Sequence, residues 1–133
     1  MTGLFTPTKA AAAMAAVAAL ALPGAGQAHH SFSMFDATKV ITLKGTVKEF
    51  QWTNPHVVIW VYADSQTSGP ELWSVELTSP GNLTRQGWNR VQFKPGDKVS
   101  VEVNPLRDGE HGGGFKQITN LVTGQVLSGG RAG

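Results

Sequence analysis

Four histidines are the residues of this sequence best suited to chemistry, because the chain contains no cysteine. Without thiols the protein has no disulfide, no thiolate metal site and no thiol nucleophile. Imidazole nitrogens bind zinc, copper and iron in preference to calcium or magnesium. The candidate metal ligands are therefore His29, His30, His56 and His111, with Asp108 as an acidic neighbour.

The first 28 residues are typical of a cleaved secretory signal. Lys9 precedes an apolar run over residues 10–22, and Gly26 and Ala28 are small residues at the two positions that a signal peptidase reads. The alternative is a membrane anchor, but the run is shorter than the roughly 20 apolar residues of a spanning helix. We therefore predict cleavage after Ala28, a periplasmic or secreted protein, and no membrane span in the mature chain.

Cleavage after Ala28 would place a free α-amine on His29, beside the imidazole of the same residue. An amine with a pKa of about 8 and an imidazole with a pKa of about 6.5 both lose a proton readily to a metal. A third nitrogen, from His30, His56 or His111, would complete the T-shaped arrangement that holds copper in proteins with an N-terminal histidine. The Irving–Williams order favours Cu(II) at such a site. The alternative is a frayed terminus whose histidines have no fixed position.

The other two histidines lie in sequences typical of turns. His56 follows Asn54 and Pro55, and His111 follows the run Arg-Asp-Gly-Glu at residues 107–110. Arg107 is expected to orient a carboxylate there, and the three glycines at 112–114 let the backbone approach a ligand closely. The alternative is two plain solvated turns, because two histidines without close ligand spacing are a weak signal.

The tryptophans differ in whether they lie within an expected strand or next to a loop. Trp60 and Trp73 fall within expected strands, where packing is the usual role of an indole. Trp52 precedes a loop and is expected to stack a ligand on the binding face. Asn54 and Arg107 are the polar residues expected to contact the same ligand.

The elements that must position these residues are mostly strands. Strands are expected where apolar and polar residues alternate with a period of two, or where β-branched and aromatic residues cluster. Five segments show one of these patterns: residues 40–50, 57–63, 72–77, 98–103 and 115–122. Gly45 in the first strand indicates a bulge or a sharp bend. A short helix is expected over residues 83–87, with Ser79 or Asn82 as its cap.

Three strands, a helix and two strands is the order of the OB-fold, a five-stranded and partly open barrel. We therefore predict an all-β fold with one short helix, and a small sandwich of the same strands is the alternative. The predicted organisation is a signal peptide at 1–28, an N-terminal segment at 29–39, an OB-like barrel at 40–127 and a disordered tail at 128–133. Because two loops frame the binding face of this fold, His56 and His111 are expected to meet at one rim of the barrel.

The sequence resembles a family of small secreted bacterial proteins known only as a domain of unknown function. The resemblance covers nearly all of the mature chain and is carried by A-H-H-S-F at 28–32, W-T-N-P-H at 52–56 and P-L-R-D-G at 105–109. It implies a periplasmic or secreted protein with a small β-barrel. It implies no activity and assigns no site residue.

Charge and composition restrict the function further. Removal of Lys9 with the signal leaves ten basic and nine acidic residues, a net charge of +1, with no basic stripe. Scattered charge argues against a nucleic-acid partner, which needs clustered Lys and Arg. No nucleophile-elbow, phosphate-loop or paired-carboxylate motif is present.

Three functions remain. The first is an exported binding module that holds copper or another transition metal through histidines. The second is a metal-free periplasmic adaptor that binds a peptide, an oligosaccharide or an envelope protein through the barrel face. The third is an enzyme, such as a copper oxidase of polymers, which the small size of the domain disfavours because it offers little cleft for a substrate.

Overall fold

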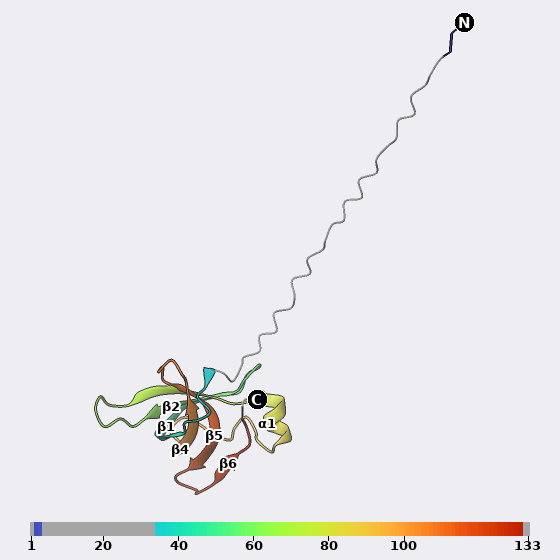
Figure 1. Cartoon of the computed structure of the whole chain (residues 1–133). Coiled ribbons are helices and arrows are strands. Elements are labelled where there is room, and N and C mark those ends of the chain that lie inside the picture. The colour runs from blue at the N-terminus through green and yellow to red at the C-terminus, as the bar shows by residue number, and fades with distance from the viewer. Residues whose placement is uncertain (1, 4–33, 132–133) are drawn as a thin grey trace.

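The computed structural model describes residues 2–3 and 34–131, so His29, His30 and all of the predicted signal peptide except residues 2–3 lie outside the described residues. Six strands and one short helix follow one another in the described part of the chain (Figure 1). They are β1 (Ile41–Gln51), β2 (Val58–Ala63), β3 (Glu71–Glu76), α1 (Pro80–Arg85), β4 (Lys98–Pro105), β5 (Gly112–Asn120) and β6 (Val126–Ser128).

The strands form a closed barrel with the connectivity of the OB-fold. The order is β3-β2-β1-β4-β5-β6, and a parallel pairing of β3 with β5 closes the first five strands into a ring. β1 is long enough to pair with two neighbours, with β4 along its first half and with β2 along its second half. The predicted all-β barrel is thereby confirmed, and the sandwich alternative is not the fold.

Gly45 is the residue at which β1 passes from one neighbour to the other. It faces Val99 of β4 on one side and Ala63 of β2 on the other. A Cβ added to Gly45 would lie 1.9 Å from the backbone oxygen of Tyr62. The glycine therefore permits a close approach of two strands, and the predicted bulge lies slightly later, between Val47 and Glu49.

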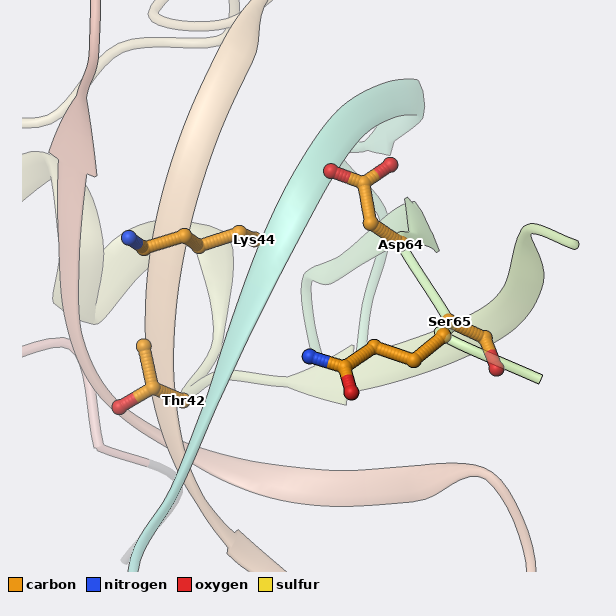
Figure 2. A pocket seen from close by; sticks show the side chains of 5 residues that line it. Thr42, Lys44, Asp64 and Ser65 are labelled. Carbon is orange, nitrogen blue, oxygen red and sulfur yellow. The ribbon is translucent and has the colours of Figure 1, made fainter.

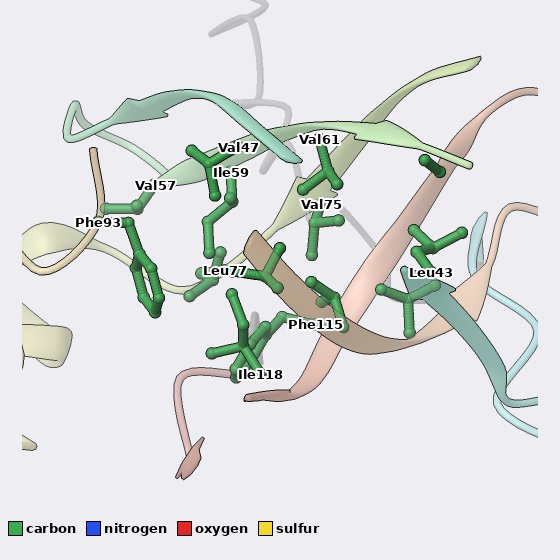
Figure 3. Close-up of a cluster of buried hydrophobic side chains, with 14 of the residues drawn as sticks. Leu43, Val47, Val57, Ile59, Val61, Val75, Leu77, Phe93, Phe115 and Ile118 are labelled. Carbon is green, nitrogen blue, oxygen red and sulfur yellow. The ribbon is translucent and has the colours of Figure 1, made fainter. Parts of the chain in front are cut away.

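The core fills the barrel with the inward-facing residues of the alternating strands. Figure 3 shows these side chains converging from several strands on one interior. The largest of those that are fully buried are Phe115, Ile59, Leu77, Leu83 and Ile118. Burial of this apolar surface is the main term that stabilises the fold, at about 25 cal/mol per Å².

The helix α1 begins earlier than the sequence pattern predicts. Ser79 is the N-cap, since its side chain accepts a hydrogen bond from the Asn82 amide, and Pro80 occupies the first turn. Proline is favoured there because the amide it lacks would have no helical partner. Leu83 of α1 and the nearby Trp88 are both buried, and Trp88 meets Phe115 edge to face at 5.5 Å.

No helix in the described part of the chain is long and apolar enough to cross a membrane.

The end of the chain differs from the expectation of disorder after residue 127. Ser128 belongs to β6 and pairs with Gln117 of β5. The backbone oxygen of Gly130 accepts a hydrogen bond from Thr78, and Arg131 forms a bridge to Leu77. Residues 128–131 are therefore ordered against the end of β3, while 132–133 lie outside the described residues.

Asp97 orders the turn that leads into β4, and it makes the fold sensitive to acid. Its carboxylate accepts hydrogen bonds from the Lys94 backbone amide and from the Lys94 ammonium, at 3.0 Å and 2.8 Å. Burial acts to raise the pKa of this carboxyl, but the hydrogen bonds from Lys94 outweigh it and hold the pKa below its ordinary value.

A lowered pKa in the folded state means that Asp97 stabilises the fold above about pH 4 and that this contribution is lost as the pH falls through the lowered value. The variant Asp97→Asn should lower the free energy of unfolding by about 1 kcal/mol at pH 7. Urea unfolding of both proteins between pH 7 and pH 2 should show that the difference in their free energies of unfolding becomes smaller below about pH 4. A difference that stays constant over this range would contradict the assignment.

Candidate functional site

The chain that leads into β1 lies against the β4–β5 loop (residues 106–111). Phe35 forms an antiparallel bridge with Leu106, and the Arg107 amide donates a hydrogen bond of 2.9 Å to the Met34 oxygen. A further hydrogen bond of 2.8 Å joins the Asp36 amide to the Pro105 oxygen. The described N-terminal segment is thus fixed beside the loop that carries His111.

His111 lies against the start of β3. Its imidazole stacks on the indole of Trp73, with ring centroids 5.0 Å apart and planes inclined by 16°. Its Nε2 atom lies 3.5 Å from Oε2 of Glu71. The His111 side chain is 48% exposed and that of Glu71 is 31% exposed, so solvent and small ions reach both groups.

His56 occupies a different part of the barrel. It closes the β1–β2 loop (residues 52–57), and its Nδ1 atom forms a short contact with Oε1 of Glu76, the last residue of β3. Glu71 and Glu76 are five positions apart, a separation of about 16 Å along a strand, and an odd separation places their side chains on opposite faces. The two histidines therefore flank β3 from its two ends.

The expectation that His56 and His111 share one rim is therefore wrong, and strand direction gives the reason. β1 and β4 are antiparallel neighbours, so the loops that follow them leave at different ends of the pair. Among residues 2–3 and 34–131, no group of three or more His, Asp or Glu residues lies close enough to hold a metal ion.

Asp108 and Arg107 have structural contacts within the β4–β5 loop. The carboxylate of Asp108 accepts a hydrogen bond of 2.9 Å from the Glu110 amide and so stabilises the turn. The positive charge of Arg107 acts on the Asp36 carboxylate. Hydrogen bonds from Thr38, together with the nearby charges of Arg107 and Lys39, hold the pKa of the Asp36 carboxyl below its ordinary value.

The predicted ligand contacts Trp52 and Asn54 lie in the β1–β2 loop. Trp52 is partly buried and meets Phe50 edge to face at 5.5 Å, so its indole packs against the core. Asn54 is exposed and precedes Pro55 through a cis peptide bond. Neither residue lies at the end of β3 that His111 contacts.

The glycine run at 112–114 also serves the packing of the barrel. The three residues are buried and begin β5. A Cβ on Gly113 would lie 2.7 Å from the Val103 side chain, and one on Gly114 would lie 3.0 Å from the Phe35 ring. The absence of side chains thus lets β5 and the N-terminal segment pack closely, where the sequence suggested contact with a ligand.

A polar groove lies outside β1, near the point where β2 ends. Figure 2 shows Thr42 and Lys44 projecting from β1 while Asp64 and Ser65 come from the following loop. The groove has a volume of about 340 Å³, and Gln66 completes its lining. Such a lining offers hydrogen bonds and both signs of charge to a small polar molecule, and no sequence motif marks it.

Glu71 and Trp73 are partners of His111 that the sequence pattern does not reveal. Trp73 lies on the face of β3 that carries Val75, and the same alternation places Glu71 there. The missing information was the parallel register of β3 and β5, in which Ser74 faces Gly112. That register brings His111, the residue before Gly112, beside Trp73.

Comparison with known proteins places the chain in a family. Neither a curated protein nor a solved structure matches it. A family model, described as a family of unknown function, DUF6152, matches residues 14–116. The match covers more than half of the chain, as the resemblance of its motifs implied. The protein therefore belongs to the family of unknown function DUF6152.

Proposed function

We propose that the protein is an exported binding module that holds copper or another transition metal at the β4–β5 loop. The ligands would be the α-amine and imidazole of His29, the imidazole of His111 and, as a further candidate, His30. The observation that carries the proposal is the attachment of Met34 and Phe35 to Arg107 and Leu106.

The attachment limits how far the histidines of the N-terminal segment can be from His111. His29 lies five positions before Met34, and five residues span at most about 17 Å when extended. His111 lies in the loop to which Met34 is hydrogen-bonded. The chain is therefore long enough for His29 to reach His111, and the short tether lowers the entropy cost of closing the site.

The chemistry of the ligands favours copper. Cleavage after Ala28 would give His29 an amine and an imidazole that chelate on one residue, and a third nitrogen from His111 would complete the set. Neutral nitrogen ligands bind Cu(II) more tightly than the other divalent ions of the first transition row. His56 is not part of this proposal, because it lies at the other end of β3 against Glu76.

The test is a calorimetric titration with Cu(II) of protein that has been exported and processed by its host. Mass spectrometry would first establish that the chain begins at His29. A matched variant carries one additional glycine before His29, which moves the amine away from its own imidazole. We expect the extra residue to weaken Cu(II) binding by about tenfold or more. Equal affinity of the two proteins would exclude the terminal chelate.

A second candidate is a metal-free adaptor that binds a periplasmic partner through the barrel face. It is favoured by aromatic side chains on the outer face of β2, where Tyr62 is exposed below the Lys48 ammonium and Trp60 donates a hydrogen bond to Gln51. Thermal unfolding with and without Cu(II) separates the two candidates. A native-state ligand at about 100 times its Kd raises stability by about 2.7 kcal/mol, whereas an adaptor without a metal site would show no change.

A further inference from the structure

We propose that one end of the barrel docks on the surface of an anionic phospholipid bilayer. This docking end consists of the β5–β6 turn (residues 121–125) with Val126, and of the segment 89–93. It lies at the start of β4, because the Leu121 amide donates a hydrogen bond of 2.9 Å to the oxygen of Lys98. The β4–β5 loop follows the other end of this strand, about 23 Å away, so the inference goes beyond the proposed metal site and does not depend on it.

Apolar side chains are exposed together at the docking end. Of the seven large apolar side chains that are exposed in the described part of the chain, four lie here: Val91, Leu121, Val122 and Val126. Val122 is 80% exposed and Val91 is 79% exposed. A glutamine of each segment joins the two segments through a side-chain hydrogen bond of 3.3 Å. Single exposed apolar residues are ordinary, but a group of them marks an interaction surface.

The β5–β6 turn presents these side chains without leaving a backbone amide unpaired. The side-chain oxygen of Asn120 accepts hydrogen bonds from the Val122 and Thr123 amides, at 2.9 Å and 3.0 Å. The Thr123 hydroxyl accepts one from the Gln125 amide at 3.2 Å, and backbone oxygens accept the other two. All five amides of the turn are therefore satisfied within the protein. This suits entry into the headgroup region of a bilayer, where little water remains to pair with an amide.

The segments around the docking end are basic. Residues 77–101 and 111–131 contain one carboxylate, Asp97, and six basic residues: Arg85, Arg90, Lys94, Lys98, Lys116 and Arg131. Asp97 is only 12% exposed and lies 2.8 Å from the Lys94 ammonium. Positive charge beside exposed apolar side chains complements an anionic bilayer, because each Lys or Arg near such a surface strengthens binding by about fivefold.

A bilayer fits the docking end better than a second copy of the chain or an acidic protein does. Two copies that met through this surface would bring like charges together. Figure 1 shows the turn between β5 and β6 at the lower tip of the molecule. A turn at a tip can enter a lipid surface with a small apolar area, whereas a stable protein interface buries about 1,200 Å² or more of matching surface.

The experiment measures co-sedimentation of the exported and processed protein with lipid vesicles. One set contains phosphatidylglycerol and phosphatidylcholine in equal parts, and the other contains phosphatidylcholine alone. We expect about tenfold or tighter binding to the anionic vesicles, and weaker binding as the salt concentration rises. The variant Val122→Asp removes an apolar contact and adds a negative charge, so it should weaken binding to the anionic vesicles by about tenfold or more.

The matched control is Val40→Asp, which changes the net charge by the same amount. Val40 is 51% exposed and precedes β1, whose first residue, Ile41, faces Val103 near the end of β4. Its affinity for the anionic vesicles should stay within about twofold of the parent, because the charge lies more than a Debye length from the docking end. Equal losses in the two variants would overturn the docking end as the site of contact.

Two further outcomes would overturn the lipid partner. Absence of binding to the anionic vesicles, or equal binding to both sets, would leave the surface to an acidic protein. Size-exclusion chromatography at high protein concentration tests the second copy of the chain. A dimer of the parent protein that disappears in Val122→Asp would assign the docking end to self-association, and we expect the parent to elute as a monomer.

Discussion

Replacing Gly45 with alanine is expected to lower the free energy of unfolding by about 3 kcal/mol. The added Cβ would lie 1.9 Å from the Tyr62 oxygen and 2.9 Å from Cα of Ala63, and both contacts are with backbone that cannot rotate away. β1 and β2 would have to separate at the point where β1 also pairs with β4. The substitution therefore weakens two interfaces of the barrel at once.

The matched control for this prediction is Gly81→Ala. Gly81 lies in α1, and the nearest atom to an added Cβ is the end of the flexible Arg85 side chain at 3.8 Å. Alanine there should stabilise the protein by about 0.5–1 kcal/mol, because glycine is the poorer helix former. Urea unfolding followed by tryptophan fluorescence measures both changes. Equal stability of Gly45→Ala and the parent protein would contradict the close approach of the two strands.

Replacing His111 with alanine is expected to weaken Cu(II) binding by about tenfold or more, which corresponds to about 1.4 kcal/mol or more. The variant removes the nitrogen ligand that the β4–β5 loop supplies and leaves the amine and imidazole of His29. Stability should change little, because the His111 side chain is 48% exposed. A calorimetric titration with Cu(II) gives both the affinity and the number of bound ions.

His56→Ala is the control, since it removes an imidazole that also contacts a glutamate of β3. We expect this variant to bind Cu(II) as the parent does. A larger loss of affinity in His56→Ala than in His111→Ala would move the site to the β1–β2 loop and would contradict a metal site at the β4–β5 loop.

The fold follows from the sequence more directly than the site does. The period-two alternation in segments such as residues 98–103 and the glycine-rich turns predict the five barrel strands and their order. β6 was missed because it has only three residues, too few to show a period. Its position depends on contacts with distant parts of the chain, such as the hydrogen bond from Thr78 to Gly130.

The candidate site could be predicted only in part for a similar reason. Sequence order places His56 and His111 in loops, but it does not give the register of the strands between them. The direction of β1 relative to β4 separates the two loops, and the parallel pairing of β3 with β5 brings His111 to Glu71 and Trp73. Both relations are set by closure of the barrel, which is a property of the whole chain.

The measurement that tests the metal site most directly is the selective broadening of amide signals by Cu(II). Two-dimensional proton–nitrogen spectra of the processed protein would be recorded with less than one equivalent of the paramagnetic ion. We expect the signals of His111, Gly112 and the Trp73 indole to broaden first, together with those of the first residues of the mature chain. Broadening centred on His56 and Glu76, or spread evenly over the surface, would contradict a metal site at the β4–β5 loop.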